Sequence, residues 1–414
     1  FLREARRKSP RLAELAFRLR SAGATPKTFD EAINSVDRRH WRFATDSEYE
    51  QLLDAQTWTL VPRNDADNII TGKWVFKIKK TENGDIERYK ARWVARGFTQ
   101  KHNVDFTEIF APVIRYSSVR LLMALANAHD LEAYGLDVSN AFARADADTD
   151  LYVNQPRGYT HKDETGKSLI CKLNTILYGT KQAARLWNKH FQKHLTSHNF
   201  RQLESDPCIY MHYSTEFGIQ FVGLYVDDII HLTPKQGAHP WLLKLCNDSF
   251  PTTTQGKLSW ILGMKITRDR NSRTLTLSQT QGILDYLEDI NMTNANPLTS
   301  PMQAGWKYGD GSPVTDPEKI TEFRSHVARL SYFATCTRPD IVFAIHCLSR
   351  FLSKPNKSCF TALNHLNRYM AGTPHKGLKY HFGQSTSLKM EAYSDATFGG
   401  DDNASAKSNT GYVI

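Results

Sequence analysis

Two adjacent aspartates, Asp227 and Asp228, lie between two short apolar runs, residues 219–226 (IQFVGLYV) and 229–232 (IIHL). Apolar, β-prone runs separated by a two-residue break predict two strands joined by a tight turn. Two carboxylates on a rigid hairpin tip can hold a divalent metal ion. Asp is also common in hairpin turns for backbone reasons alone, so an ordinary turn is the alternative interpretation of this pair.

A third acid, Asp137, lies 90 residues before Asp227, near the end of the apolar segment LEAYGLDVSNAF at 131–142. Three carboxylates on neighbouring strands repel one another unless cations lie between them, as they do in a two-metal phosphoryl-transfer site. One ion would lower the pKa of an attacking hydroxyl, and the other would bind a triphosphate. The alternative is three unrelated surface acids.

The segment 71–102 is strongly basic and interleaved with aromatic residues, because it holds nine Lys or Arg against three Asp or Glu. A ribbon of this composition suits contact with phosphates and nucleic acid. The solvated face of an ordinary hairpin is the alternative.

Periodicity predicts the elements that must position these groups. Helices are expected at 46–56, 117–129, 180–199, 279–290, 321–335, 339–352 and 358–371, a basic hairpin at 72–98, a strand at 274–278 and β structure over 377–414. Ala184, Trp187, Phe191 and Leu195 form one apolar stripe on the helix at 180–199, which predicts a core contact. A Pro-, Gly- and Ser-rich stretch at 297–317 predicts a linker.

The bulk composition narrows the class of protein. The 414 residues predict two to three domains at ~150 residues each, and the formal net charge of +10 favours a polyanionic partner, with an acidic membrane as the competitor. No apolar run reaches the ~18 residues that a membrane span needs. Six cysteines without Cys-x-x-Cys or paired His spacing support neither a zinc site nor disulfides, which points to an intracellular protein.

Ten short pieces, taken together, resemble the polymerase part of a copia-type LTR retrotransposon polyprotein. They occur in the family's order over roughly residues 40–414 and form a highly specific combination. The pieces are TWTLVP (57–62), KWVFKIK (73–79), RYKARWVARGFTQ (88–100), FAPV (110–113), LDVSNAF (136–142), LYGTKQAARLW (177–187), YVDD (225–228), LGMKI (262–266), TRPDIVFA (337–344) and SDATFGG (394–400).

The resemblance implies an α+β fold, namely a polymerase right hand with an antiparallel sheet in its palm, a helical connection and a truncated RNase H-like β segment. Fingers are implied at about 57–130 and 143–180, and palm at about 131–142 and 181–270. The implied domains are a basic N-terminal tail or linker (1–45), reverse transcriptase fingers and palm (46–300), a linker with a helical connection (301–376) and the start of an RNase H-like domain (377–414). Because the chain begins at Phe1 and stops within a strand-like GYVI, we expect a fragment of a longer polyprotein.

The resemblance also implies roles for residues at the metal and triphosphate sites. Asp137 and Asp227 would bind both of two Mg²⁺ (or Mn²⁺) ions, with Asp228 in support and the backbone carbonyl of Val138 as a further ligand. Lys90 and Arg92 would hold the triphosphate of a dNTP, or else are exposed strand charges.

Further residues have implied roles around the nucleotide and the primer. Gln182 would contact the nucleotide or the template, or else cap the helix at 180–199. Phe142 would close off the 2′ side of the sugar, or else be a core aromatic. Leu262-Gly263-Met264 would be a primer-positioning turn, or else an ordinary hairpin. Asp395 would be the first acid of an RNase H-like site whose other carboxylates lie beyond the chain.

Two stretches depart from the family's usual pattern. Residues 141–145 (AFARA) replace Ala-Phe-Leu-Asn-Gly and are followed by Asp146, Asp148 and Asp150, an acidic cluster expected to disturb template or metal binding. Residues 178–185 (YGTKQAAR) lack the usual Leu and Pro, which is expected to loosen packing at the start of a helix.

The resemblance therefore implies an RNA-directed DNA polymerase that transfers nucleotides from dNTPs to a primer 3′-hydroxyl on an RNA or DNA template. Its partners would be an RNA template, a DNA primer and the rest of the polyprotein, with no membrane, in a cytoplasmic retroelement particle or the nucleus. Two alternatives are an inactive remnant that only binds nucleic acid and a structural module of the particle. A nucleotide cyclase also uses palm-borne acids, but the pieces outside the palm disfavour it.

Overall fold

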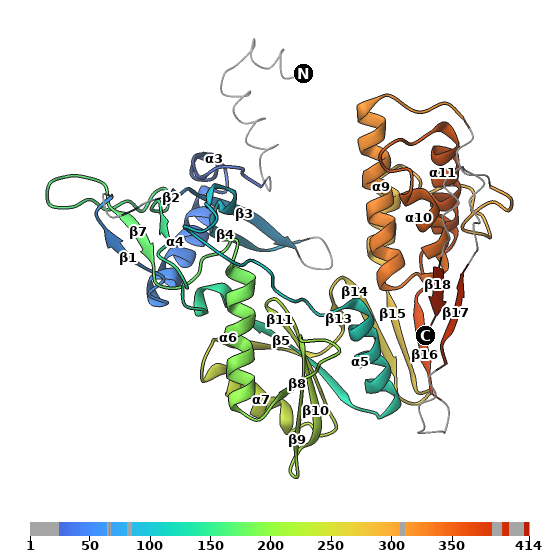
Figure 1. The fold of residues 1–414 in the computed structure, drawn as a ribbon, viewed down its shortest axis with the longest axis horizontal. Coiled ribbons are helices and arrows are strands. Elements are labelled where there is room, and N and C mark those ends of the chain that lie inside the picture. The colour runs from blue at the N-terminus through green and yellow to red at the C-terminus, as the bar shows by residue number, and fades with distance from the viewer. Residues whose placement is uncertain are drawn as a thin grey trace.

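The computed structural model describes residues 25–63, 66, 68–80, 85–306, 311–382, 391–396 and 410–413, and Figure 1 shows how their elements are arranged. Helices and largely antiparallel sheets are combined in these residues, as the predicted α+β class requires. The basic stretch at 1–20, predicted to be a tail, lies outside the described residues.

A six-stranded sheet, here called the central sheet, forms the base of the molecule in the view of Figure 1. It contains β5 (Glu132–Val138), β8 (Arg201–Gln202), β9 (Ile209–Ser214), β10 (Gly218–Tyr225), β11 (Asp228–Thr233) and β12 (Thr252–Lys257). Its order is β12-β5-β11-β10-β9-β8, with every pairing antiparallel.

Two helices, α6 (Ala183–Ser197) and α7 (Ala238–Asn247), pack on the central sheet. Trp187, Phe191 and Leu195 of α6 are buried in one core with strand residues such as Val222. The apolar stripe predicted for this helix is therefore confirmed as core. An aromatic side chain buried in this way contributes several kcal/mol, which fixes α6 behind the strands.

In the part of the chain that the structure describes, the N-terminal region combines helices, a small sheet and the basic hairpin. Its elements are α3 (Phe29–Asn34), α4 (Arg38–Asp54), β1 (Trp58–Val61), β2 (Ile69–Ile70), β3 (Gly72–Lys80), β4 (Ile86–Ala95), η2 (Gly97–Thr99), η3 (Ala141–Arg144), β6 (Tyr152–Val153) and β7 (Ile170–Leu173). The small sheet has the order β1-β7-β6-β2, whereas β3 and β4 pair with each other and confirm the predicted basic hairpin.

Helix α4 begins at Arg38, so its predicted start at residue 46 was wrong. The preceding polar stretch is helical because Trp41 is fully buried and meets the rings of Phe76 (5.2 Å) and Tyr89 (4.7 Å) edge to face. Those partners lie on the basic hairpin, so local periodicity carries no sign of them. The expected boundary after residue 45 consequently falls inside a helix.

A bundle of helices, here called the helical bundle, has its own core in the C-terminal part of the chain. It contains α8 (Thr280–Asp289), α9 (Pro317–Cys336), η4 (Pro339–Ile341), α10 (Val342–Ser349) and α11 (Lys357–Gly372), which confirms the helices predicted there. Asp316 caps α9 by accepting from the Glu318 N–H, and Pro317 occupies the first turn, where a missing N–H costs nothing. None of the helices among the described residues is long and apolar enough to cross a membrane.

The TRPD part of the TRPDIVFA piece has a structural role within the helical bundle. Arg338 is fully buried, pairs with Asp340 at 2.9 Å and donates to the backbone oxygen of Thr373 at 2.9 Å. The bond from Arg338 to Thr373 ties η4 to the end of α11.

A second sheet joins the central sheet to the helical bundle. It contains β13 (Trp260–Ile261), β14 (Met264–Asp269), β15 (Thr274–Ser278) and β16 (Leu378–His381) in that order, and α5 (Tyr116–Ala128) packs against it. Because β16 pairs with β15, residues 378–381 continue this sheet, which differs from the expected start of a new domain at residue 377. Strands β17 (Tyr393–Ala396) and β18 (Thr410–Val413) pair separately.

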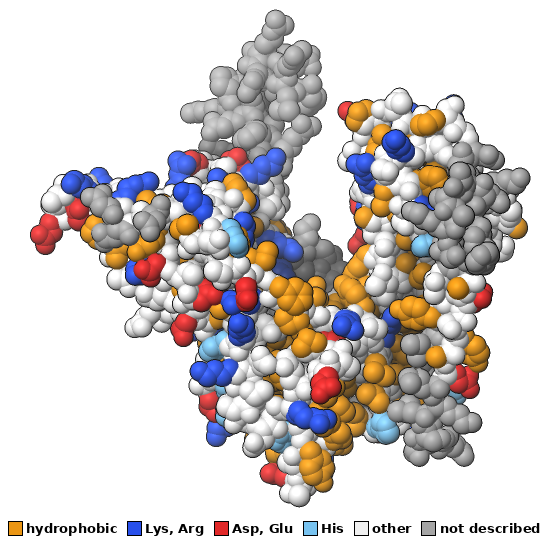
Figure 2. Space-filling view, viewed as in Figure 1, with side chains coloured by type: hydrophobic (Ala, Val, Ile, Leu, Met, Phe, Trp, Pro, Cys, Tyr) orange, Lys and Arg blue, Asp and Glu red, His pale blue; other side chains and the backbone are white. Residues whose placement is uncertain are grey.

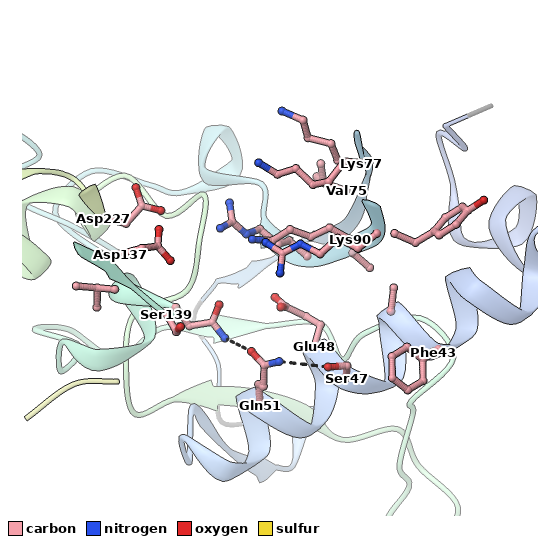
Figure 3. Close-up of a pocket in the computed structure, with 18 of the residues that line it drawn as sticks. Phe43, Ser47, Glu48, Gln51, Val75, Lys77, Lys90, Asp137, Ser139 and Asp227 are labelled. Carbon is pink, nitrogen blue, oxygen red and sulfur yellow. Dashed lines mark hydrogen bonds between the residues drawn. The ribbon is translucent and has the colours of Figure 1, made fainter. Parts of the chain in front are cut away.

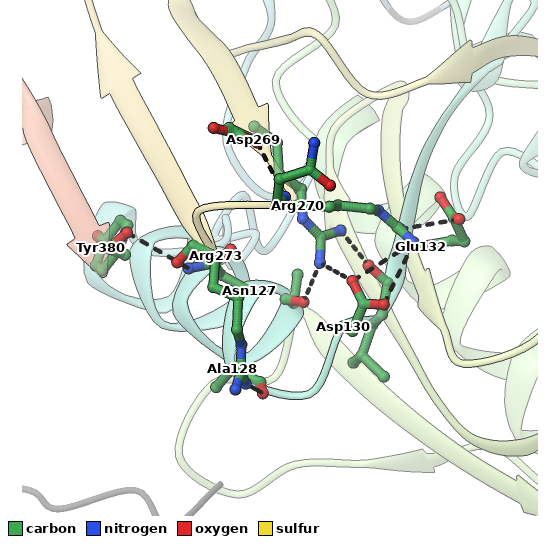
Figure 4. A network of polar contacts seen from close by, with 12 residues as sticks. Asn127, Ala128, Asp130, Glu132, Asp269, Arg270, Arg273 and Tyr380 are labelled. Atoms are coloured by element: carbon green, nitrogen blue, oxygen red, sulfur yellow. Dashed lines mark hydrogen bonds and ion pairs between the residues drawn. The ribbon is translucent and has the colours of Figure 1, made fainter. Parts of the chain in front are cut away.

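A polar network holds the second sheet to the central sheet (Figure 4). Arg268 forms an ion pair with Asp130 at 2.9 Å, and Arg270 forms one with Glu132 at 2.8 Å. Glu132 begins β5, the strand that carries Asp137. The network therefore links the second sheet to the strand that carries Asp137, the first predicted metal ligand.

The N-terminal region and the helical bundle stand on the same side of the central sheet in Figure 1. Figure 2 shows that the surface is hollowed between them. The N-terminal region, the central sheet and the helical bundle therefore surround this hollow.

Candidate active site

The hairpin predicted around the two aspartates is confirmed, with its turn one residue earlier than expected. Tyr225 of β10 pairs with Asp228 of β11, which leaves Val226 and Asp227 as the two turn residues. Val226 has φ +57°, a region that β-branched residues rarely adopt. The indole Nε1–H of Trp187 donates to the Val226 oxygen at 2.5 Å and holds this conformation from α6.

Strand pairing brings the third acid to the same place. Asp137 on β5 lies directly opposite Asp228 on β11, and the Val138 N–H donates to the backbone oxygen of Asp227 at 3.1 Å. All three aspartates and Val138 line one cavity of about 680 Å³. Figure 3 shows the carboxylates of Asp137 and Asp227 side by side at its edge. The alternative of three unrelated surface acids is therefore excluded.

The three carboxylates are close enough to repel one another. Burial raises the pKa of Asp228 to about 6, and the charges of Asp227 and Asp137 add to that rise. Among the described residues, no group of three or more His, Cys, Asp or Glu side chains is placed so that it could hold a metal ion. A set of carboxylate oxygens is nevertheless the donor chemistry that Mg²⁺ and Mn²⁺ prefer, and bound cations would remove the repulsion.

The opposite wall of the cavity is the basic hairpin. Successive side chains of each strand point to opposite faces of the hairpin, so that Trp74 and Phe76 are buried in the core while Lys77 faces the cavity. On β4 the same alternation turns Lys90 and Arg92 into the cavity. The cavity-facing residues pair across the hairpin as Lys77 with Lys90, Lys79 with Arg88, and Val75 with Arg92.

Arg92 makes no ion pair with an acid among the described residues and is held by an aromatic ring instead. Its guanidinium carbon lies 4.5 Å from the centre of the Tyr178 ring, and its buried Nε has no hydrogen-bond partner among the described residues. Burial lowers the pKa of Lys90, and the charge of Arg92 lowers it further. Two crowded cations with free donors facing carboxylates across a cavity suit a ligand that carries several negative charges, such as a triphosphate.

The sequence analysis missed two contributions of α4 to this cavity. Glu48 is buried in the cavity wall, and its Oε1 accepts the Trp93 N–H at 3.3 Å. Gln51 accepts from the Asn140 amide at 2.9 Å, so α4 is tied to the loop after β5 (Figure 3). Asn140 has φ +51°, for which Asn is well suited. No local signal marks these residues, because their partners lie far away along the chain.

Gln182 is not brought into the cavity. Its side chain is fully buried, accepts from the Gln100 amide at 3.0 Å and donates to the Asp105 backbone oxygen at 2.8 Å. It stands at the N-cap position of α6 but makes no side-chain capping bond. The capping bond that the sequence suggested is therefore absent, and the contact with nucleotide or template stays a prediction for a residue outside the cavity lining. Gln182 instead fastens the start of α6 to the loop at 97–106.

Phe142 lies behind the acids on η3. Its ring is half-buried and meets the Tyr178 ring edge to face at 4.8 Å. Because Tyr178 also supports Arg92, Phe142 belongs to a stack that reaches the cavity wall without lining the cavity itself.

Two other predicted sites lie away from the cavity. Leu262 and Gly263 form a two-residue turn between the paired residues Ile261 and Met264, and Met264 is fully buried. Asp395 is exposed on β17, opposite Gly411 of β18.

The acidic cluster after Phe142 is largely neutralised. Asp148 forms an ion pair with Arg185 of α6 at 2.8 Å, and Asp150 forms one with Lys172 at 2.9 Å. Two of the three acids are thus paired with cations, and the effect of the cluster on template or metal binding stays a prediction.

Comparisons with known proteins agree with this geometry. Residues 55–304 match the family described as reverse transcriptase (RNA-dependent DNA polymerase). Over 94% of its length the chain is 37% identical to the retrovirus-related Pol polyprotein from transposon TNT 1-94 of Nicotiana tabacum. Over 95% it is 36% identical to that from transposon RE1 of Arabidopsis thaliana. The chain spans 29% and 26% of those two proteins.

Proposed function

Since the chain belongs to the reverse transcriptase family of copia-type transposon polyproteins, we propose that the cavity is where a dNTP donates its nucleotide to a primer 3′-hydroxyl. One observation carries this proposal: a single cavity has three carboxylates on one wall and Lys77, Lys90 and Arg92 on the other. Nucleotidyl transfer needs both, because oxygen ligands must hold divalent ions while cations neutralise the phosphates.

Asp137 and Asp227 would hold two Mg²⁺ or Mn²⁺ ions, with Asp228 and the Val138 carbonyl as further oxygen donors. When bound, the ions supply a lower pKa for the primer hydroxyl and neutralise part of the triphosphate charge. Lys90 and Arg92 stabilise the charge that builds on the leaving pyrophosphate. Their donors are already turned into the cavity, so little reorganisation accompanies the reaction.

The surrounding units supply the polymer site. The hollow between the N-terminal region and the helical bundle is where we place the primer–template duplex, and the hairpin cations would contact its backbone. The N-terminal region then acts as the fingers and the central sheet as the palm. By analogy with the two Pol polyproteins, the chain would work as part of a retroelement polyprotein.

The test is primer extension on poly(rA) annealed to oligo(dT) with Mg²⁺ or Mn²⁺. We expect the parent protein to extend the primer and Asp227→Asn to fail. A protein that binds primer–template and never extends it would contradict the proposal and favour the nucleic-acid-binding remnant. Co-sedimentation with retroelement particles without duplex affinity would favour the structural module.

A further inference from the structure

The turn at Leu262 and Gly263 is held by a residue of the helical bundle. Both turn residues have positive φ, +48° and +73°, so the backbone is in a conformation that needs outside support at Leu262. The Tyr332 hydroxyl on α9 donates to the Leu262 backbone oxygen at 2.7 Å. One side-chain bond thus joins the helical bundle to the tip of the β13–β14 hairpin.

Gly263 leaves room for this hydroxyl because it has no side chain. A Cβ placed on Gly263 would lie 2.4 Å from the Tyr332 hydroxyl oxygen and 3.6 Å from its Cζ. Real Cβ atoms do not approach an oxygen so closely, whereas 3.6 Å is ordinary van der Waals contact. The hydroxyl group alone therefore conflicts with a side chain at position 263, and the aromatic ring does not.

The same tyrosine lies next to the hairpin that carries the aspartates. Its ring meets Tyr116 at 6.2 Å, and Tyr116, Leu262 and Tyr225 all pack on one core cluster. Tyr225 is the residue immediately before the Val226–Asp227 turn. The ring of Tyr332 is itself 39% exposed, so the contact lies at the molecular surface where a duplex can reach the turn.

We propose that Tyr332 is a positioning residue for the primer, acting through the hydrogen bond that fixes the Leu262–Gly263 turn against α9. The inference rests on the proposed polymerase function and adds to it a residue of the helical bundle. A turn held at its carbonyl presents its backbone to the primer strand in one arrangement. Without that bond the hairpin tip moves, and the primer is held less tightly while the dNTP site is unaffected.

The test compares Tyr332→Phe with a matched control, Tyr286→Phe. Tyr286 also lies in the helical bundle and donates to the Asn367 side-chain oxygen at 2.8 Å, a bond that involves neither residue of the turn. Loss of one hydrogen bond at the turn should weaken primer–template binding about five-fold in Tyr332→Phe. Fluorescence anisotropy with a labelled duplex measures it. Extension products from a single binding event should be shorter, while the KM for dNTP stays within about two-fold of the parent.

A second measurement tests the contact itself without any catalysis. Gly263→Ala should lower the melting temperature in the parent, because of both positive φ and the clash with the hydroxyl. In the Tyr332→Phe background only the φ cost is left, so the same substitution should lower the melting temperature less.

Equal duplex binding by Tyr332→Phe, Tyr286→Phe and the parent would overturn the inference. An equal fall in melting temperature on Gly263→Ala in both backgrounds would also overturn it. So would a rise in the KM for dNTP that accompanies the loss of duplex binding in Tyr332→Phe. A parent protein that binds no duplex would contradict the proposed function and this inference together. A parent that binds duplex without extending it would contradict the polymerase function, and anisotropy would still decide the role of Tyr332.

Discussion

Glu48 is a buried carboxylate beside the cations of the basic hairpin. Burial raises its pKa from 4.5 to about 7, against the lowering effects of the Trp93 N–H, Arg92 and Lys90. Below pH ~4.5 the group is neutral in both the folded and the unfolded chain. As the pH rises to about 7, the unfolded chain loses its proton first, so the folded state loses up to about 3 kcal/mol of stability.

We therefore expect Glu48→Gln to gain stability relative to the parent as the pH rises from 5 to 8. Gln keeps an oxygen that accepts the Trp93 N–H, so the backbone contact survives. Melting temperatures of both proteins at the two pH values measure the effect, with Glu50→Gln on the exposed side of α4 as the control. A difference in melting temperature between Glu48→Gln and the parent that does not change with pH would show that the raised pKa of Glu48 is not its cause.

Phe142 tests whether the stack behind the acids selects the sugar. If its ring closes the 2′ side of the nucleotide, Phe142→Val should raise rNTP use relative to dNTP by roughly ten- to a hundredfold. If Phe142 only packs against Tyr178, the substitution leaves a cavity that costs ~3 kcal/mol and lowers both activities in parallel. Incorporation of both nucleotides, measured together with the melting temperature, separates the outcomes. An unchanged ratio would rule out a role in sugar selection.

Residue types and spacing pointed to the acids and cations that line the cavity, whereas Gln182 lies outside the lining. Asp137, Asp228 and Lys90 lie on strands whose period-two pattern fixes the direction of each side chain. Asp227 lies in the turn that joins β10 to β11. Gln182 instead lies at the junction of a loop and a helix, where its direction is set by Gln100, 82 residues away. Glu48 was missed for a similar reason, since its partner Trp93 belongs to another element.

Among the elements, the basic hairpin turns Lys77, Lys90 and Arg92 toward the cavity. Removing the charge of Lys90 or Arg92 should raise the KM for dNTP by about tenfold, because a charge-assisted bond to phosphate is lost. The control is Lys73→Ala, an exposed position on β3 outside the cavity. Steady-state kinetics at saturating duplex measure the effect. Identical KM values for all three variants would mean that the hairpin does not hold the triphosphate.

Elements with a strong internal pattern were predicted well, and those that depend on distant partners were not. The helix at 117–129 and the strand at 274–278 follow from their own periodicity. The first turns of α4 depend on Trp41 reaching the basic hairpin. Strand β16 is short and pairs with β15, about a hundred residues earlier, so its place in the second sheet could not be read from its sequence.

At the scale of the whole molecule, the cavity exists only because two separately packed units face each other. The central sheet contributes the three aspartates, and the N-terminal region contributes the cations together with Glu48. The Gln51–Asn140 hydrogen bond links the two units at the cavity edge. Substitutions on the acid wall should therefore affect the chemical step and leave duplex binding in the hollow unchanged.

The most direct measurement is the rate of single-nucleotide incorporation in a single turnover, with duplex affinity measured on the same samples. Replacing Asp137 or Asp227 by Asn should lower the rate ~10³-fold or more while duplex affinity stays within about two-fold, because a charged ligand to both ions is lost. Asp228→Asn should cost less. An Asp227→Asn protein that incorporates nucleotides as fast as the parent would show that the cavity is not the site of nucleotidyl transfer.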